Sequence, residues 1–199
     1  MRTGKRLAAM AMWVGAALLA ACGNSSSDGP ASLRMVNASS GYPSLDLSID
    51  AVSANKAVTL GSVGTYVNAA TSGVSTVVSN TGSTAALSTA SRTLTKDVKY
   101  TLVAYGSSGA LKTALIQENV AAPAANVTSL QILNLAPDAG AVDVYLTGST
   151  DSLDSASANA SGLGSGSTLT YTSVTSGTYR LRFARFRGLS TSVPRAHAV

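Results

Sequence analysis

Residues 129–146 read Ser-Leu-Gln-Ile-Leu-Asn-Leu-Ala-Pro-Asp-Ala-Gly-Ala-Val-Asp-Val-Tyr-Leu, and this stretch decides the fold class. It opens on a run of apolar residues, continues through an Ala-Pro-Asp turn signal, and ends on Val142–Leu146, where apolar side chains occupy alternate positions. A period of two is typical of a β-strand with one buried face. The stretch therefore predicts two strands joined by a turn.

The same pattern occurs earlier in the chain. Residues 32–38 match residues 129–135, and residues 45–49 match residues 142–146 at the same spacing, so that Leu33 corresponds to Leu130. Similarity at a fixed offset is the mark of an internal repeat. We expect two copies of one structural unit.

The second copy is longer between its anchor points. Thr71–Gly73 matches Thr175–Gly177 at a spacing seven residues wider than that of the opening strands. We place the seven extra residues in the segment Asp151–Thr168, which is rich in Ser, Ala and Gly.

Short strands separated by Gly/Ser turns account for the rest of each copy. No long amphipathic helix is predicted between residues 32 and 179. The sequence predicts an all-β fold, with antiparallel, immunoglobulin-like β-sandwich modules of six or seven strands each, in tandem. In the first copy we expect strands near Leu33–Asn37, Leu45–Ile49, Thr65–Ala69, Gly73–Ser79, Val98–Tyr105 and Thr113–Val120.

The segment Leu130–Leu146 resembles the opening of a bacterial envelope family, the domain of unknown function DUF4397. In that family an Ala-Pro-Asp turn and a Val-Asp-Val-Tyr strand follow the first strand. Lys99–Gly106 is similar to the late Tyr-Thr strand of the family, whereas the turn Ala38–Pro43 departs from its pattern. The resemblance covers most of residues 32–182. It implies an extracytoplasmic sandwich module, often tandem and lipid-anchored, with no established activity or ligand.

The second copy ends before its last strands. Tyr179–Arg182 still alternates, but the residues from Phe183 onward match nothing in the first copy. We therefore expect a first module at 32–122, an incomplete second module at 129–182, and an aberrant or disordered basic tail at 183–199 that arose from a frameshift or premature truncation. The alternative is that the arginines of the tail bind anionic lipid or lipopolysaccharide. A Tyr-Thr-Leu-Val-like strand in another downstream reading frame would support the frameshift.

Positive charge gathers at the two ends of the chain. The chain has 14 Lys+Arg, 9 Asp+Glu and a formal charge of +5. Residues 22–179 nevertheless hold six basic and nine acidic side chains. This mildly acidic body has no basic stripe with interleaved aromatics, which excludes nucleic acid as the expected partner.

The N-terminus has the layout of a secretory signal. Basic residues precede an uncharged run, and Leu19-Ala20-Ala21-Cys22 resembles the bacterial lipobox. The resemblance implies a signal peptide at 1–21, cleavage between Ala21 and Cys22, and lipidation of Cys22, which is the single Cys of the chain. Palmitate and diacylglycerol chains, at about 0.8 kcal/mol per buried methylene, would anchor the protein to a membrane. The alternative is a buried structural Cys.

The residues after Cys22 predict a tether. Residues 22–31 are mostly polar and are expected to span roughly 15–20 Å as a flexible chain. Gly23 stands where an Asp would signal inner-membrane retention, which favours the outer membrane as location, on either its periplasmic or its surface face.

The acidic residues offer candidates for chemistry. Asp46 and Asp143 occupy equivalent positions, and Asp50 or Asp138 could pair with them. The chain has no Asp-rich calcium loop, and scattered carboxylates pair by chance. We favour the interpretation that these Asp side chains lie on the solvent face of a strand or bind turn amides.

The nucleophile motifs are equally weak. The single His, His197, lies near the C-terminus, and no Gly-x-Ser-x-Gly elbow accompanies the many serines. Gly162–Gly166 lacks the Lys of a phosphate loop and is interpreted as a flexible loop. The seven Tyr residues suit sandwich rims, or contacts to carbohydrate or protein. We expect no catalytic, cofactor or metal site.

Three functions remain open. The first is a non-enzymatic, lipid-anchored envelope protein for display, adhesion or scaffolding, with an envelope protein or a glycan as partner. The second is a periplasmic lipoprotein that binds a small ligand or glycan, and an enzyme is the third.

Overall fold

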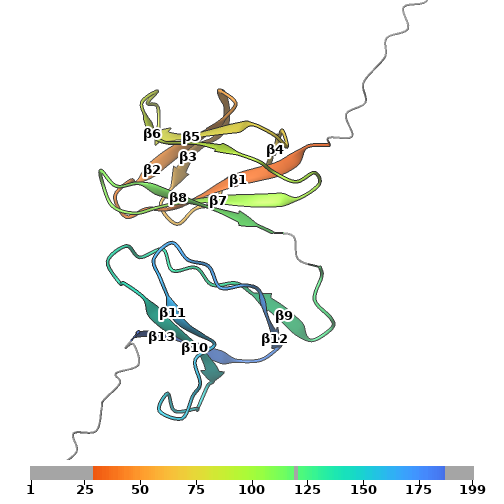
Figure 1. Ribbon diagram of the computed structural model, residues 1–199, viewed down its shortest axis with the longest axis vertical. Coiled ribbons are helices and arrows are strands. Elements are labelled where there is room, and N and C mark those ends of the chain that lie inside the picture. Colours follow the sequence, from red (N-terminus) through yellow and green to blue (C-terminus); the bar gives the residue numbers. More distant parts are fainter. Residues whose placement is uncertain (1–28, 119–120, 187–199) are drawn as a thin grey trace, which may run out of the picture.

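The computed structural model describes residues 29–118 and 121–186, and all regular structure in these residues is β-strand (Figure 1). This confirms the predicted all-β class. No helix in the described part of the chain is long and apolar enough to cross a membrane. The strands are β1 Ala31–Ala38, β2 Ser44–Ile49, β3 Val52–Thr59, β4 Val67–Ala69, β5 Val74–Asn80, β6 Ala86–Arg92, β7 Lys99–Tyr105, β8 Lys112–Gln117, β9 Val127–Leu130, β10 Val142–Gly148, β11 Ala160–Leu163, β12 Thr172–Thr175 and β13 Tyr179–Arg185.

Strands β1–β8, which we call the N-terminal part, form a sandwich of two four-stranded sheets (Figure 1). The strand orders are β4-β1-β7-β8 and β3-β2-β5-β6. All pairs are antiparallel except β1 with β7, which run parallel from Ser32 opposite Lys99 to Ala38 opposite Tyr105. The parallel pair differs from the purely antiparallel arrangement that we expected, and it places the end of this part next to its beginning.

Alternating residues of the central strands fill the core of this sandwich. Leu33 and Met35 of β1, Leu45 and Leu47 of β2, and Leu102 of β7 have no exposed surface. Burying one such side chain contributes about 1.5–3 kcal/mol, so these strands are the main source of stability.

Sequence analysis did not predict two of these strands, β3 and β6. They lie at the two edges of the same sheet, and few of their side chains are buried. Because few of these side chains reach the core, the two segments lack the apolar alternation that identifies a strand in the sequence. The N-terminal part consequently has eight strands, not six or seven.

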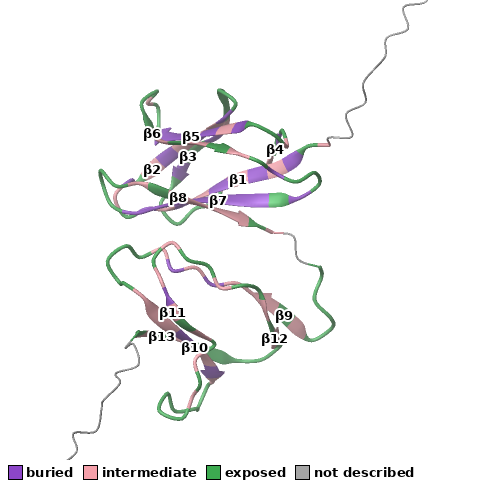
Figure 2. Ribbon diagram, in the orientation of Figure 1, coloured by how far each residue is buried: buried purple, intermediate pink, exposed green. Residues whose placement is uncertain are grey.

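Strands β9–β13, which we call the C-terminal part, form a three-stranded sheet of order β11-β10-β13 and a two-stranded pair of β12 with β9. Its core is small, with Ile132, Val144 and Leu163 buried. Figure 2 shows the contrast, with buried positions common in β1, β5 and β7 and sparse in β9–β13.

A buried asparagine has the same surroundings in both parts. The Asn37 side-chain amide donates to the main-chain oxygens of Tyr42 and Val58, at 2.9 and 3.0 Å, and its Oδ1 accepts from the Ser39 N–H at 3.0 Å. The Asn37 side chain thus ties β1 to the loop that follows it and to β3.

Asn134 makes the matching set of bonds in the C-terminal part. Its amide donates to the oxygens of Gly140 and Leu163, both at 2.9 Å, and its Oδ1 accepts from the Ala136 N–H at 3.2 Å. Asn37 and Asn134 stand at the repeat spacing noted in the sequence.

Strand registers extend this correspondence and correct one detail. Leu47 pairs with Val78, and Val144 pairs with Phe183. The first members of these pairs are 97 positions apart and the second members 105, so the C-terminal part holds eight extra residues, not seven. They fall between β10 and β11, in residues 149–159, which overlap the first half of the segment Asp151–Thr168 in which we placed them.

Two boundaries also differ from expectation. Gly162 and Leu163, which we interpreted as part of a flexible loop, belong to β11, because Leu163 is buried in the small core. Residues Phe183–Arg185, which we assigned to the tail, complete β13 by pairing with β10. The remaining tail, residues 187–199, lies outside the described residues.

Candidate functional site

A polar cluster lies on the outer face of the β4-β1-β7-β8 sheet. Because Leu33 and Met35 point into the core, Arg34 between them points outward, and it stands opposite Thr101 of β7. Tyr66 comes just before β4, and Glu118 follows β8. Strands far apart in the sequence thus bring four polar side chains together.

The Glu118 carboxylate is the centre of this cluster. The Arg34 Nη2 donates to Glu118 Oε1 at 3.1 Å, and the Arg34 Nε donates to the Thr101 hydroxyl at 2.9 Å. The hydroxyls of Thr101 and Tyr66 both donate to the same carboxylate. The Arg34 guanidinium lies 4.4 Å from the centre of the Tyr66 ring, and Lys99 Nζ lies 5.3 Å from it.

These contacts change the proton affinities of two groups. Burial raises the pKa of Glu118, but hydrogen bonds from Thr101, Tyr66 and Arg34, with the Arg34 charge, outweigh it, so the pKa lies below its usual value. The pKa of Tyr66 is raised by burial and by its bond to the negative Glu118. At neutral pH the cluster therefore holds a carboxylate and a protonated phenol.

The arrangement is suited to holding strands together more than to chemistry. Arg34 and Glu118 neutralise each other, with side chains 30% and 24% exposed. A general base needs a free lone pair directed at a substrate, whereas both oxygens of Glu118 already accept protein donors. The cluster joins β1, β7, the approach to β4 and the end of β8.

Asp46 and Asp143, the equivalent acidic residues, both bind main-chain amides. Asp46 Oδ1 accepts from the Ala57 N–H at 2.7 Å and its Oδ2 from the Gly82 N–H at 3.0 Å. Asp143 Oδ1 accepts from the Gly162 N–H at 2.9 Å, and also from a serine hydroxyl. This confirms the interpretation that these Asp side chains bind amides.

Both amides belong to irregular backbone. Ala57 and Gly162 have φ of 51° and 67°, in the left-handed region, and the register shifts between Leu45 and Leu47 and between Val142 and Val144. Each Asp thus fastens a β-bulge between its strand and the next. For Asp46, burial raises the pKa, but the amide bonds and Lys56 lower it more, so the pKa lies below the usual value.

The two other Asp candidates do not join these residues in a site. Asp50 Oδ1 accepts from the Ser75 N–H at 2.8 Å, and Asp138 lies in the exposed turn after Pro137. In residues 29–118 and 121–186, no three His, Cys, Asp or Glu side chains gather in a group that could hold a metal ion.

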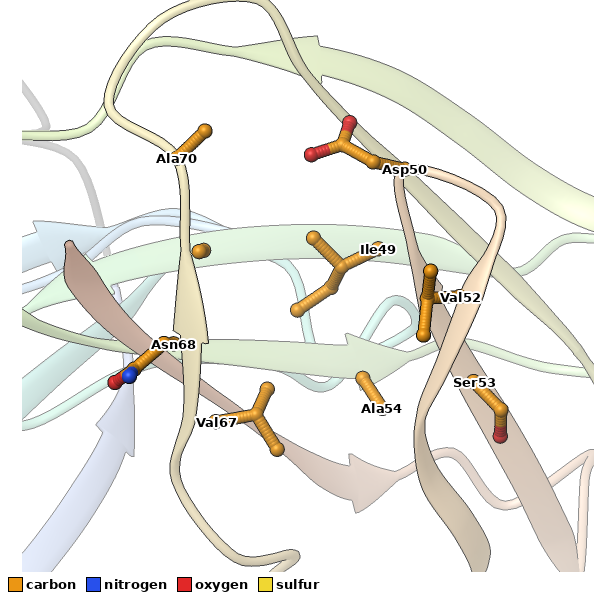
Figure 3. Close-up of a pocket in the computed structure, with 9 residues that line it drawn as sticks. Ile49, Asp50, Val52, Ser53, Ala54, Val67, Asn68 and Ala70 are labelled. Atoms are coloured by element: carbon orange, nitrogen blue, oxygen red, sulfur yellow. The ribbon is translucent and has the colours of Figure 1, made fainter.

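An apolar pocket of about 280 Å³ opens at the side of the N-terminal sandwich, between β3 and β4 (Figure 3). Ile49, Ala54 and Val67 line it, and Val52 stands at its edge. Asp50 is the one charged side chain among its lining residues, and its carboxylate is already bonded to the main chain. The pocket could take a small apolar group.

The tyrosines occupy three environments, and Tyr66 and Tyr145 are half-buried. Tyr42, Tyr100 and Tyr105 are buried, and the hydroxyls of Tyr42 and Tyr100 accept main-chain N–H groups. Tyr171 and Tyr179 are exposed, and neither lines the pocket of Figure 3. Ala21, Cys22 and His197 lie outside the described residues.

Sequence analysis missed the cluster around Glu118. The alternation of β1 indicates that Arg34 points outward, but no local signal shows that β1 pairs with β7. Arg34 and Thr101 are 67 positions apart, and the apolar pattern of neither strand indicates that the two strands pair.

Comparison with known families gives one match. The sequence model described as "Domain of unknown function (DUF4397)" matches residues 31–145, a range that covers the N-terminal part and continues into β10. No curated protein matches the chain.

Proposed function

The chain belongs to the DUF4397 family, since the match covers more than half of its residues, and from this premise we propose that it is a lipid-anchored, non-enzymatic protein of the cell envelope. Its β-sandwich would serve display, adhesion or scaffolding. The observation that carries the proposal is the use of its carboxylates: Asp46, Asp143 and Glu118 all bind groups of the fold.

The anchor rests on the sequence around Cys22. The lipobox-like Leu19–Cys22 and the mostly polar residues that follow it precede β1, which begins at Ala31. Lipidated Cys22 would hold the sandwich close to a membrane, and Gly23 favours the outer membrane.

We further propose that the C-terminal part is an incomplete second copy of the N-terminal part. Three features support this: the matching bonds of Asn37 and Asn134, the matching bulges fastened by Asp46 and Asp143, and the shared strand registers. In this correspondence β9 to β13 stand for β1, β2, β3, β4 and β5.

A Cys22→Ser variant tests the anchor. After cell fractionation we expect the unchanged chain in the membrane pellet and Cys22→Ser in the soluble fraction, without incorporated palmitate. Ser25→Ala, a similar small change in the same segment, is the control and should stay in the pellet. Membrane retention of Cys22→Ser would refute the lipid anchor.

The pocket of Figure 3 favours a second candidate, a lipoprotein that binds a small ligand or glycan. Its test is a glycan array and an apolar fluorescent probe, both applied to the full chain with Cys22→Ser. Binding that is lost in Ala54→Phe, which fills the pocket, and kept in Ala86→Phe on exposed β6 would favour this function. It would count against the scaffold.

A further inference from the structure

The two sides of the N-terminal sandwich, where the edges of its sheets face each other, differ in how they are filled. On the side of β6 and β8, the Arg92 guanidinium bridges the two sheets, since it donates to the hydroxyl of Thr76 at 2.9 Å and to that of Thr113 at 3.0 Å. On the side of β3 and β4, the short side chains of Ala54 and Val67 leave the pocket of Figure 3 open. A long polar side chain thus spans one side, and the other side is hollow.

The walls of this pocket are aliphatic. Ile49 and Ala69 are buried, Ala54 and Val67 are half-buried, and no aromatic side chain is among its lining residues. A saccharide needs several polar partners to replace the water bound to its hydroxyls, and such walls do not supply them. The volume of about 280 Å³ exceeds that of a cavity that holds benzene, about 150 Å³, and gives room for roughly eight to twelve carbon atoms.

One polar side chain is directed at the pocket. In Figure 3 the Asp50 carboxylate points across it toward Ala70, whereas Ser53 and Asn68 point away. Ser75 of β5 fixes Asp50 in this position, because the Asp50 N–H donates to the Ser75 oxygen at 2.9 Å and the Ser75 N–H donates to Asp50 Oδ1 at 2.8 Å. The two bonds hold the carboxylate at the mouth of the pocket before a ligand arrives.

The charge of Asp50 lacks a counter-ion in the part of the chain that the structure describes. The single ion pair there joins Arg34 and Glu118, and no Lys or Arg is among the lining residues of the pocket. Ser75 binds Oδ1, which leaves Oδ2 to accept from a ligand. A cationic donor complements this oxygen better than a neutral donor does, because hydrogen bonds between charged groups are the stronger ones.

We propose that the pocket binds a cationic amphiphile, an apolar chain that ends in a primary ammonium group. The chain fills the space between β3 and β4, and the ammonium group donates to Asp50 Oδ2. Apolar burial supplies most of the affinity, and Asp50 selects the head group. This inference rests on the second function proposed above, ligand binding at this pocket, and narrows the ligand to one chemical class.

The part of the chain that precedes the pocket residues most closely has the wrong chemistry to fill it. Gly29 and Pro30 line a neighbouring depression together with Asn68–Ser72. The residues before them, Cys22–Asp28, carry no aliphatic side chain, and their one charge is negative, as that of Asp50 is. An acyl chain on Cys22 would bring the apolar part without the cation.

Three probes of equal chain length test the head group: octylammonium, 1-octanol and octanoate. Each is titrated at neutral pH into the full chain with Cys22→Ser, and amide chemical shifts measured by NMR report the site and Kd. We expect shifts in residues 49–54 and 67–70, with Kd about fivefold lower for octylammonium than for 1-octanol, and the weakest binding for octanoate. Added salt should reduce the preference, because Asp50 is exposed.

Asp50→Asn isolates the charge. Asn keeps the Oδ1 that accepts from Ser75 and tolerates φ of 49° as Asp does, so the turn should fold unchanged. Kd for octylammonium should rise about fivefold, to the value for 1-octanol, while Kd for 1-octanol stays the same. Asp97→Asn makes the same change at an exposed Asp with φ of 60° that does not line the pocket, and it should leave all three values unchanged.

The outcomes separate the class of ligand from the pocket itself. If 1-octanol binds in the pocket and octylammonium binds no more tightly, or if Asp50→Asn leaves the octylammonium Kd unchanged, the cationic class is wrong and the ligand-binding function stands. If no probe shifts residues 49–54 and 67–70, both are wrong, and a pocket filled by another segment of the full chain or by a second copy would give this result. Binding by Cys22→Ser that is absent in the acylated chain, held in lipid nanodiscs, would make the chain's own acyl group the occupant and overturn the proposal.

Discussion

Strands β5 and β13 pair with equivalent strands, β2 and β10, in the same register, but one face of β5 is buried and the matching face of β13 is exposed. Val78 lies opposite Leu47 on β2, and Phe183 lies opposite Val144 on β10. Yet Val78 is 1% exposed and Phe183 is 56% exposed. The difference teaches that the burial of a strand face depends on the sheet stacked over it, because both strands present apolar side chains at alternate positions.

The largest expected effect comes from truncating one leucine in the full core and one on the exposed face of β13. Leu47→Ala in the full core should lower the free energy of unfolding by about 2–5 kcal/mol, since it removes contacts and leaves a cavity. Leu181→Ala on the open face should change it by less than about 0.5 kcal/mol. Chemical denaturation followed by circular dichroism measures both, and equal losses would mean that the face of β13 is covered.

The paired asparagines sharpen the comparison. Asn37→Ala leaves buried main-chain groups of Ser39, Tyr42 and Val58 without partners and should cost about 1–3 kcal/mol. Asn134→Ala should cost less, because Gly140 and one further bonded group, Ala136, can reach water. A larger loss in Asn134→Ala, measured by the same denaturation, would contradict this account.

The two bulges have different residues at the position with positive φ, Ala57 in the N-terminal part and Gly162 in the C-terminal part. Gly162→Ala should destabilise by about 1 kcal/mol, because φ of 67° disfavours a Cβ. Ala57→Gly, at φ of 51°, should instead stabilise or leave stability unchanged, since it relieves the same strain. Midpoints of thermal unfolding for the two variants should shift in opposite directions, and a stabilising Gly162→Ala would exclude the shared bulge geometry.

The smallest expected effect concerns pH. The pKa of Glu118 in the folded chain lies below its ordinary value of 4.5. Its stabilisation is therefore complete above that value and is lost as pH falls through the lower folded-state pKa. Glu118→Gln should flatten the loss of stability in acid and cost about 0.2–1 kcal/mol at neutral pH.

The C-terminal part provides the control for this titration. At the positions of Arg34 and Tyr66 it has Gln131 and Tyr171. A Gln131→Ala variant should leave the acid sensitivity unchanged, because Gln131 makes no hydrogen bond to a carboxylate in the described residues. If Glu118→Gln lost stability in acid as steeply as the unchanged chain, Glu118 would not be the group whose protonation destabilises the fold.

Much of the candidate site was beyond sequence analysis. The Asp residues that bind amides were predicted, since Asp46 and Asp143 recur at one position of a repeat. The Glu118 cluster was not, because its members come from the first strand, the approach to the fourth, the seventh and the residue after the eighth. Hydrogen bonds between such distant segments have no local signature.

Where apolar side chains alternate clearly, the sequence alone determined that a segment is a strand and which of its faces is apolar, because alternation is a local property with a period of two. It determined this for β2 and β10, and for the family match they share. Only the tertiary structure decided which apolar faces are buried and which polar residues meet. That outcome depends on whether a distant strand such as β7 is present to cover the face, and free energy of burial comes from the partner as much as from the strand itself.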